Sequence, residues 1–365
     1  MKICFLAGAN SLHSHRWIKY FANIGHEIHW VSLMPSNEPL PKVEFYDIGP
    51  LSNNPVKIIR QVIKFRKLIK KINPDILHIH SVGTYGIIGA SANFHPMITT
   101  AWGSDVLIAG KSGIKRLLIR YVLQKSDLIT CDADHMINTI SKLGIKPNKI
   151  NLIYFGVEPD KFKPGPKDPD ILTKWSVGDS PTVISLRNLE PIYDVETLIK
   201  CIPYVLKEIP KAKFIIASAG SQEKYLKKLA ESMRVIDNTR FIGRYSHVKL
   251  PNYLNSSDIY VSTSLSDAGI AASTAEAMAC GLPVIVTDSG ENGKWVSCGV
   301  EGFVVPVKNP EILAEKIIYL LTNEKERTKM GENGRKTIEE KNNYYKEMEK
   351  MEKLYREVFY YASVI

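Results

Sequence analysis

The sequence predicts an α/β protein built from two consecutive β-α-β halves. At 365 residues the chain is longer than one hydrophobic core usually supports, so two domains are expected. In both halves, short apolar runs alternate with longer segments of helical periodicity, which is typical of parallel sheets covered by helices. Between the halves, residues 164–169 read Pro-Gly-Pro-Lys-Asp-Pro and form the clearest linker in the chain.

The first half begins with a predicted strand over residues 3–8, a helix with Trp17 and Phe21 on its apolar side, and a second strand over residues 28–33. Further strands are predicted over residues 76–79, 97–100, 128–131 and 150–154. The first strand-to-helix loop lacks Gly-x-Gly-x-x-Gly, which argues against a dinucleotide-dependent oxidoreductase.

Four residues of this half are candidate ligand contacts, because open α/β sheets bind ligands at the carboxyl ends of their strands. His13 and Arg16 stand in or beside the first strand-to-helix loop. Trp102 and Asp105 belong to the sequence W-G-S-D, which follows the strand over residues 97–100. A histidine in such a loop can equally be structural, and Asp105 can equally cap the following helix.

Positive charge is concentrated in the first half. Residues 1–165 hold 21 Lys and Arg against 11 Asp and Glu, whereas residues 166–365 hold 27 of each, so the net charge of +10 lies entirely in the first half. Such a half favours an anionic partner: nucleic acid, a membrane surface or an anionic substrate. Because no basic motif with interleaved aromatic residues is present, we do not expect nucleic-acid binding.

Two predicted helices carry much of this charge. Residues 57–72 contain seven Lys and Arg, residues 111–125 form a second basic helix, and neither segment contains Asp or Glu. The apolar face of the first helix is predicted to comprise Ile58, Ile59, Val62, Phe65, Ile69 and Ile72. Attraction to anionic lipid headgroups is worth about 1 kcal/mol per basic residue near the surface. An ordinary solvated helix explains either segment, but the pair favours an anionic membrane surface.

The cysteines and the apolar runs predict a cytoplasmic protein. The five cysteines are scattered and show neither metal-ligand spacing nor a disulfide framework, which is typical of reduced thiols. The apolar run after Met1 ends at Gly8 and is too short for a signal peptide. No apolar stretch approaches the roughly 18 residues that span a bilayer.

The second half repeats the β-α-β pattern. Strands are predicted over residues 183–186, 214–217, 239–242, 259–262 and 303–305, with a helix over residues 195–204. The chain from Glu311 onward is predicted to be helical. Its last segment, residues 344–361, carries Tyr355 and Phe359 on one side and should dock on the first half.

Residues 260–288 form the most informative stretch: a strand end, a loop of small residues, a helix, a Gly-x-Pro turn and another strand. The first helical turn is predicted over residues 271–274. A helix N-terminus carries unpaired N–H groups and about half a positive charge, so it can hold a phosphate. Glu276 lies one turn further on, where a carboxylate repels phosphate but accepts hydrogen bonds from a ribose. The alternative is an ordinary β-α-β unit with a solvated glutamate.

Within this stretch, E-A-M-A-C-G-L-P-V-I-V-T-D over residues 276–288 resembles the signature of family 4 retaining glycosyltransferases, E-G-F-G-x-x-x-x-E-A-M-A-x-G-x-P-V. Weaker similarities extend the resemblance over the chain: G-H-E-I-H, W-G-S-D, F-G-V-E-P-D-K-F and G-V-E-G-F-V-V-P. The resemblance implies the GT-B fold, an α/β architecture with two Rossmann-like β/α/β domains facing across a cleft. Residues 1–164, with the returning helix over 344–365, would form the acceptor side, and residues 165–343 would bind the nucleotide sugar.

The resemblance also implies roles for single residues of the second half. Glu276 would bind the ribose hydroxyls, and Arg187 would bind phosphate, although its match is offset by one residue unless a gap is allowed. The backbone of Gly269, Ile270 and Ala271 would meet the donor sugar, that of Ala272, Ser273 and Thr274 the diphosphate, and that of Gly243 and Arg244 the base.

Three positions depart from the family pattern. The first motif glutamate aligns with Ala268, which follows Asp267; a lysine aligns with Tyr193; and a first-domain histidine aligns with Trp102. We hypothesise that Asp267 replaces the missing glutamate through a loop that is longer by one residue. Asp267, Glu276 and Arg187 are then the expected catalytic residues. The departures can instead mark a subgroup with another donor or a loss of activity.

The implied reaction moves a sugar from a UDP- or GDP-linked donor to a hydroxyl of a glycan or lipid-linked acceptor, with retention of configuration. No Asp-x-Asp stands where a metal would bridge the diphosphate, so we expect a metal-independent reaction with no cofactor. The expected location is the cytoplasm, peripherally on the inner face of the membrane, in cell-surface polysaccharide or lipopolysaccharide biosynthesis. The alternatives are a nucleotide-sugar epimerase or hydrolase of the same fold, and a non-catalytic sugar-nucleotide-binding protein.

Overall fold

The computed structural model describes residues 1–365 except 37, 53, 108–112, 268 and 365, and for residues 104, 363 and 364 it describes the backbone but not the side chain. The chain divides into two compact units, hereafter unit 1 (Met1–Phe155 with Tyr345–Ile365) and unit 2 (Gly156–Tyr344). The sequence predicted this boundary after residue 164. The observed boundary lies earlier because the segment after Phe155 bonds within unit 2: Val157 N–H donates to Asn342 O at 2.7 Å.

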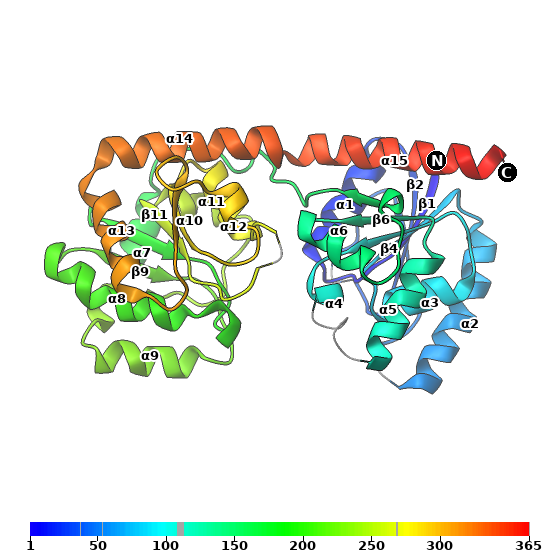
Figure 1. The fold of residues 1–365 in the computed structure, drawn as a ribbon, viewed down its shortest axis with the longest axis horizontal. Coiled ribbons are helices and arrows are strands. Elements are labelled where there is room, and N and C mark those ends of the chain that lie inside the picture. Colours follow the sequence, from blue (N-terminus) through cyan, green and yellow to red (C-terminus); the bar gives the residue numbers. More distant parts are fainter. Residues whose placement is uncertain (37, 53, 108–112, 268, 365) are drawn as a thin grey trace. The chain divides into compact units, whose positions relative to one another are not determined.

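Unit 1 contains a seven-stranded parallel sheet in the order β3-β2-β1-β4-β5-β6-β7. Strands β1, β2, β4 and β6 of this sheet are labelled in Figure 1. Three inner strands, β4, β5 and β6, are buried along their whole length, as expected for a parallel sheet with both faces covered. The strands are β1 (Lys2–Leu6), β2 (Glu27–Ser32), β3 (Val43–Asp47), β4 (Ile76–His80), β5 (Met97–Ala101), β6 (Leu128–Cys131) and β7 (Ile150–Leu152).

Seven helices of unit 1 are described. They are α1 (Leu12–Asn23), α2 (Pro55–Ile72), α3 (Thr84–Ala92), α4 (Ser104–Leu107), α5 (Gly113–Lys125), α6 (Asp134–Ser141) and α15 (Tyr344–Val364), with a 3-10 turn η2 (Pro147–Lys149) before β7. One core cluster joins the sheet to four of these helices through Phe65 of α2, Ile88 of α3, Val122 of α5 and Met136 of α6.

The C-terminal helix α15 packs on unit 1 as predicted. Tyr355 is fully buried, and its hydroxyl lies 2.5 Å from His78 Nδ1 on β4. Glu347 accepts a hydrogen bond from the backbone N–H of Tyr154 at 3.0 Å, just after β7. Phe359, expected on the same docked side, is 38% exposed. The helix is therefore held by its middle turns and not by its last aromatic residues.

Several elements of unit 1 and one detail of α2 differ from the sequence prediction. The strand β3 and the helices α3 and α6 were not predicted; β3 is a partly exposed edge strand, and α3 is rich in small residues. Ile59 was assigned to the buried face of α2 but is 59% exposed. Gln61 is buried instead, and its amide donates to Pro50 O at 2.7 Å. The other five residues of the predicted face are buried or pack against the core, so the prediction is wrong at Ile59 alone.

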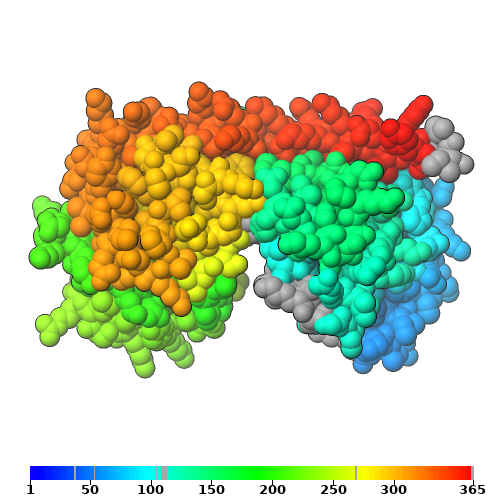
Figure 2. Space-filling view, viewed as in Figure 1, coloured from blue at the N-terminus to red at the C-terminus, as the bar shows by residue number. Residues whose placement is uncertain are grey.

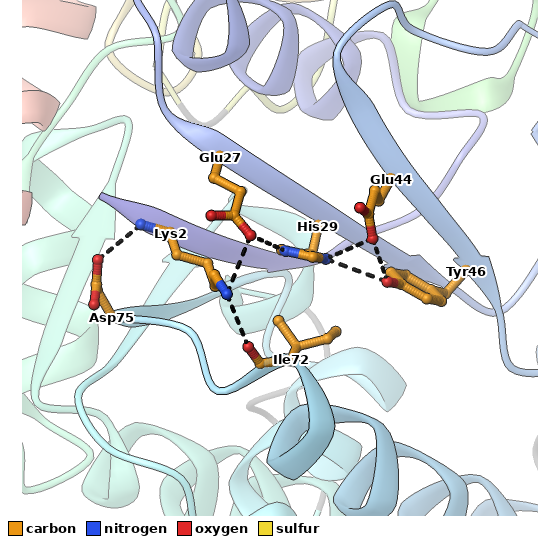
Figure 3. A network of polar contacts seen from close by, with 7 residues as sticks. All are labelled: Lys2, Glu27, His29, Glu44, Tyr46, Ile72 and Asp75. Carbon is orange, nitrogen blue, oxygen red and sulfur yellow. Dashed lines mark hydrogen bonds and ion pairs between the residues drawn. The ribbon is translucent and has the colours of Figure 1, made fainter.

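A network of polar contacts joins the first three strands of this sheet (Figure 3). His29 on β2 lies between Glu27, 3.0 Å from Nε2, and the Tyr46 hydroxyl, 3.3 Å from Nδ1. The Lys2 ammonium lies 3.1 Å from Glu27 and also donates to the Ile72 carbonyl at the end of α2. These contacts fix the register of β1, β2 and β3 and attach α2 to the sheet.

Unit 2 contains a six-stranded parallel sheet in the order β10-β9-β8-β11-β12-β13. Helices α8 and α13 pack against each other, and α13 also contacts β11, β12 and β13. The strands are β8 (Thr182–Ser185), β9 (Lys213–Ile216), β10 (Thr239–Phe241), β11 (Ile259–Ser262), β12 (Val284–Thr287) and β13 (Gly302–Val305). The helices are α7 (Pro169–Trp175), α8 (Val195–Glu208), α9 (Glu223–Ser232), α10 (Leu250–Asn255), α11 (Ala272–Ala279), α12 (Asn292–Trp295), α13 (Pro310–Thr322) and α14 (Glu324–Lys341), with 3-10 turns η3 (Pro191–Tyr193) and η4 (Ile236–Asn238).

Helix α11 is held in place by a close contact between two glycines. Gly281 ends the helix with φ +79°, a conformation that favours glycine. A Cβ atom on Gly331 of α14 would lie 1.9 Å from the Gly281 carbonyl oxygen. Only glycine at position 331 permits this approach, which sets α14 against α11 and fixes the end of the helix opposite to its N-terminus.

Among the described residues, no helix is both long enough and apolar enough to cross a membrane.

Candidate active site

The order in which the chain adds strands to the sheet of unit 2 reverses between β8 and β11. These strands are neighbours, with Ile259 opposite Val183, but the chain leaves β8 toward β9 on one side and leaves β11 toward β12 on the other. This point is a topological switch point, where open α/β sheets bind ligands beside the carboxyl ends of the strands. Two hydrogen bonds join the loops that follow β8 and β11, from Leu265 N–H to Ile192 O at 2.8 Å and from the Thr263 hydroxyl to Tyr193 O at 3.0 Å.

Arg187 and Asp267 meet at this point. Arg187 Nη2 lies 2.5 Å from Asp267 Oδ1, and the two side chains are only 10% and 8% exposed. The guanidinium also stacks over the Tyr193 ring, 4.4 Å from its centroid. Burial raises the pKa of Asp267 although the positive charge of Arg187 opposes the shift. Arg187 Nε is buried and makes no hydrogen bond within the described chain, so its N–H group is available to donate a hydrogen bond to a ligand.

Helix α11 begins without a side-chain cap. Ala271 occupies the N-cap position, where an alanine side chain cannot accept hydrogen bonds from the first N–H groups, and the first turn contains no acid. By contrast, Asn54 caps α2 and Asp168 caps α7 through their side chains. Residues 271–273 are partly exposed. The start of α11 therefore offers backbone N–H groups and the positive end of the helix dipole to an anion.

Glu276 lies on the second turn of α11 and is almost completely buried. Its Oε1 is 2.9 Å from His247 Nε2, and His247 Nδ1 is 2.7 Å from the Lys161 ammonium. The His247 ring also packs edge-on against Phe162, with the ring centroids 5.6 Å apart. Burial and the nearby charge of Glu276 raise the pKa of Tyr245.

The remaining residues predicted for the donor site lie around the same strand ends. Gly269 and Ile270 are buried, and Ser273 accepts or donates a 2.8 Å hydrogen bond with the Tyr260 hydroxyl. Ala268 lies outside the described residues. Gly243 follows β10 with φ +68°, and nothing lies within 4 Å of the position of a Cβ atom there. Arg244 is exposed and makes no hydrogen bond or ion pair with any described residue.

In unit 1, the predicted residues gather at the corresponding point of the sheet, beside β1 and β4. His13 on α1 stacks on Trp102 with ring centroids 5.2 Å apart, and Arg16 lies one turn further along α1. His80, at the end of β4, packs edge-on against Trp102. Its Nδ1 is 2.9 Å from the Ser14 hydroxyl, whereas its Nε2 is buried with no hydrogen-bond partner in the described chain.

Asp105 lies within the short helix α4, and its side chain bonds to neighbouring loops instead of taking the helix-capping role that the sequence left open. Its carboxylate oxygens accept hydrogen bonds from Val82 N–H and Trp102 N–H, both at 3.1 Å. These bonds join the loops that follow β4 and β5, and burial raises the pKa of the Asp105 carboxyl. Asp105 therefore holds Trp102 in place, and its carboxylate points toward backbone groups of the loops.

The described residues contain no group of three or more His, Cys, Asp or Glu side chains arranged to hold a metal ion.

Comparison with known families identifies the chain. A family model described as "Glycosyl transferases group 1" matches residues 170–337, and a second, described as "Glycosyl transferase 4-like", matches residues 2–133. The two matches fall on the two units. The chain belongs to the group 1 glycosyltransferases.

Relatives of this glycosyltransferase act on several acceptors. N-acetyl-alpha-D-glucosaminyl L-malate synthase of Bacillus anthracis is 26% identical over 357 residues, covering 93% of this chain and 91% of the relative. The GDP-mannose-dependent alpha-(1-6)-phosphatidylinositol monomannoside mannosyltransferase of Mycobacterium tuberculosis is 24% identical over 232 residues, covering 62% of this chain and 60% of the relative.

The solved structure of Anabaena HepE, in complex with UDP and glucose, matches with a TM-score of 0.80 at 16% identity, covering 97% of this chain and 99% of HepE. This likeness confirms the predicted GT-B fold of the glycosyltransferase.

Sequence reasoning missed two contacts in this glycosyltransferase. His247 and Lys161 were not predicted to approach Glu276, since they stand 29 and 115 positions away from it. His80 was likewise not predicted beside Trp102. A usable signal was present for His80, which directly follows the strand predicted over residues 76–79, and the carboxyl ends of such strands are where open α/β sheets bind ligands. None was present for His247, whose loop after β10 contains no recognisable motif.

Proposed function

We propose that this glycosyltransferase moves a sugar from a UDP- or GDP-linked donor to a hydroxyl of a glycan or lipid-linked acceptor, with retention of anomeric configuration. The observation that carries the proposal is the uncapped start of α11, which follows the loop whose Asp267 pairs with Arg187. Both supply positive potential to a diphosphate. HepE was crystallised with UDP, and the mycobacterial relative is named for GDP-mannose, which supports both bases.

The chemistry of the proposed reaction requires stabilisation of a leaving group. As the bond between the anomeric carbon and the donor oxygen breaks, negative charge develops on the nucleoside diphosphate. The N–H groups at the start of α11 and the buried Arg187 Nε then stabilise this charge. In a retaining reaction of this type, the same leaving oxygen accepts the proton of the attacking hydroxyl.

Glu276 binds the ribose in this proposal. Its Oε1 is occupied by His247, and its Oε2 accepts no hydrogen bond within the described chain, so Oε2 can take a ribose hydroxyl. The open backbone at Gly243 would face the base, where φ +68° and the absence of a side chain leave room for a flat ring. Asp267 would contact the donor sugar in place of the family glutamate. Its present bond to Arg187 then loosens when the diphosphate arrives.

We also propose that the reaction needs no metal ion or other cofactor. Arg187 and the α11 dipole supply positive charge where a bridging cation would otherwise neutralise the diphosphate. Turnover should therefore be unchanged in EDTA. Loss of turnover in EDTA that is restored by Mg²⁺ or Mn²⁺ would overturn this part of the proposal.

An anionic membrane surface is the second partner that we propose, through α2 and α5 of unit 1. Both helices pack against α3, on either side of it (Figure 1). Figure 2 shows the surface of α2 in blue at the lower right. Both carry exposed apolar side chains at helical spacing, namely Val56, Ile59 and Ile63 on α2 and Ile114, Leu117, Leu118 and Tyr121 on α5. Exposed stripes of this kind are typical of helices that lie in a membrane interface.

Charge supports the same surface. The seven Lys and Arg of α2 are exposed and interleave with its apolar stripe, and neither α2 nor the described part of α5 contains an acid. The apolar side chains would insert between headgroups while the basic residues contact them. The sequence-based helix 111–125 begins before the described part of α5, and residues 111–112 lie outside the described residues. The resulting location is the cytoplasmic face of a membrane that carries a lipid-linked acceptor.

A panel of nucleotide sugars tests the reaction. The expected result is release of UDP or GDP that depends on an added acceptor, with the anomeric proton coupling of the product showing retention. An isomerised donor would indicate an epimerase, acceptor-independent release would indicate a hydrolase, and binding without turnover would indicate a non-catalytic protein. Each of these three outcomes contradicts the proposal.

A further inference from the structure

The contacts of His247 fix the position of its ring hydrogen. An ammonium group can only donate, so His247 Nδ1, 2.7 Å from Lys161 Nζ, accepts the hydrogen bond. The other ring nitrogen, Nε2, then carries the hydrogen and donates to Glu276 Oε1 at 2.9 Å. Both hydrogen bonds are therefore donated in the same direction, from Lys161 to His247 and from His247 to Glu276.

Three features hold this chain in place. Lys161 lies 5.1 Å from the centroid of the Phe162 ring, and the same ring packs edge-on against His247. Arg335 of α14 donates to the Phe162 carbonyl at 3.2 Å. The segment that carries Lys161 is thus attached to the same helix that supports α11, and the imidazole is confined between its two partners.

We propose that His247, supported by Lys161, is a positioning residue that holds Glu276 ready to bind a ribose. This proposal rests on the proposed function. Because Oε1 is tied to His247, the carboxylate plane is fixed and Oε2 is presented at one orientation to a ribose hydroxyl. A free glutamate would sample several rotamers and would lose part of its hydrogen-bond energy to ordering. Discrimination between ribose and deoxyribose then depends on His247, although His247 itself need not touch the nucleotide.

The test compares the binding of UDP and GDP with that of their 2′-deoxy analogues by calorimetry, using the full chain. Wild type should prefer the ribonucleotide. His247→Ala should reduce this preference by about tenfold, because one charge-assisted hydrogen bond no longer orients Glu276. His247→Gln should retain most of the preference, since its amide can donate to Glu276 and accept from Lys161. Lys161→Met should also reduce the preference for the ribonucleotide.

Two controls separate positioning from a general structural effect. Inorganic pyrophosphate should bind wild type and His247→Ala equally, because the phosphate site at α11 is independent of Glu276. Lys249→Ala, an exposed change on the same segment, should leave every affinity unchanged. The proposal is wrong if His247→Ala keeps the wild-type ratio of ribonucleotide to deoxyribonucleotide affinity. It is also wrong if His247→Ala loses affinity for pyrophosphate as much as for the nucleotides. If wild type binds no nucleoside diphosphate, the proposed function fails and this inference fails with it.

Discussion

Arg187 and Asp267 form a buried ion pair whose nearest atoms are 2.5 Å apart, at the ends of two neighbouring strands. The pair means that the group expected to bind phosphate already has an anionic partner. Removing Arg187 has two separable consequences, one for the diphosphate and one for the carboxylate left behind.

The first prediction concerns Arg187→Ala. The affinity for UDP or GDP should fall by about 10- to 100-fold, because a charge-assisted bond to phosphate is lost. The variant should also be less stable by about 3 kcal/mol, since Asp267 stays buried without its cation. The double variant Arg187→Ala with Asp267→Asn should recover stability but not affinity, as measured by calorimetry and thermal unfolding. Recovery of both would contradict a phosphate role for Arg187.

The second prediction concerns Asp267→Asn. If Asp267 takes the place of the family glutamate, turnover of the donor sugar should fall by about 10- to 100-fold, because a charged hydrogen bond to the sugar becomes a neutral one. Affinity for the nucleoside diphosphate alone should rise, since Arg187 no longer shares its charge with a carboxylate. Steady-state kinetics and calorimetry measure the two effects. Unchanged turnover together with unchanged donor affinity would exclude the hypothesis.

The third prediction uses the uncapped start of α11. Ala271→Asp supplies an N-cap side chain and should stabilise unit 2 by about 1 kcal/mol. The same carboxylate would occupy the N–H groups and repel a diphosphate, so affinity for UDP or GDP should fall by at least about tenfold. Ala271→Ser is the matched control, since it caps the helix without adding charge and should lower affinity less. Unchanged affinity in Ala271→Asp would show that the anion does not bind at this helix.

The parts of the site that could be predicted from the sequence are the local ones. Glu276 and the start of α11 lie within one short stretch, so helix periodicity and a missing cap are visible without tertiary information. The Arg187–Asp267 pair and the His247–Glu276 contact join positions 80 and 29 residues apart, and only the sheet order brings them together.

The error at Ile59 has a similar origin. Helix α2 carries apolar residues on two sides, one packed on the sheet and one exposed, and periodicity alone cannot tell which side is buried. The buried side is the one whose Phe65, Ile69 and Ile72 join the core, and on that side Gln61 donates to the Pro50 carbonyl. For the same reason, the sequence did not reveal that α2 has an exposed apolar stripe. The distribution of its basic residues does not indicate which apolar side chains are exposed.

The fourth prediction concerns acid. Burial lowers the pKa of His80 from its ordinary value of 6.5 to about 3, and it also lowers the pKa of His78. The unfolded chain therefore binds more protons than the folded chain below pH 6.5, so stability falls as the pH is lowered toward 3. Each histidine should contribute a slope of about 1.4 kcal/mol per pH unit in that window.

Native-state hydrogen exchange of the β4 amides at several pH values between 4 and 6.5 measures this slope for unit 1. The variant His80→Asn keeps a polar partner for Ser14 but has no group that titrates there, so its slope should be smaller than that of wild type by one histidine's contribution. Equal slopes in the two proteins would show that His80 is not held neutral by burial.

The fifth prediction concerns the apolar stripes of α2 and α5. Ile114 is 78% exposed and Leu117 65% exposed, so their loss should cost the folded protein little. If both side chains insert into a bilayer, the double change Ile114→Ser with Leu117→Ser should weaken binding to anionic vesicles by at least about 100-fold, given about 1.5–3 kcal/mol for burying each side chain. Co-sedimentation with vesicles of anionic and neutral lipid measures the effect.

A matched control and a charge variant complete the design. Val300→Ser, which removes an exposed apolar side chain of unit 2, should leave vesicle binding unchanged. Lys64→Glu with Lys67→Glu should weaken binding to anionic vesicles at low salt and lose its effect at high salt, because headgroup attraction is screened whereas insertion is not. Equal binding of wild type to neutral and anionic vesicles at low salt would exclude electrostatic recruitment. Unchanged binding after the serine substitutions on α5 would leave the basic residues, without insertion, as the whole of the membrane attraction.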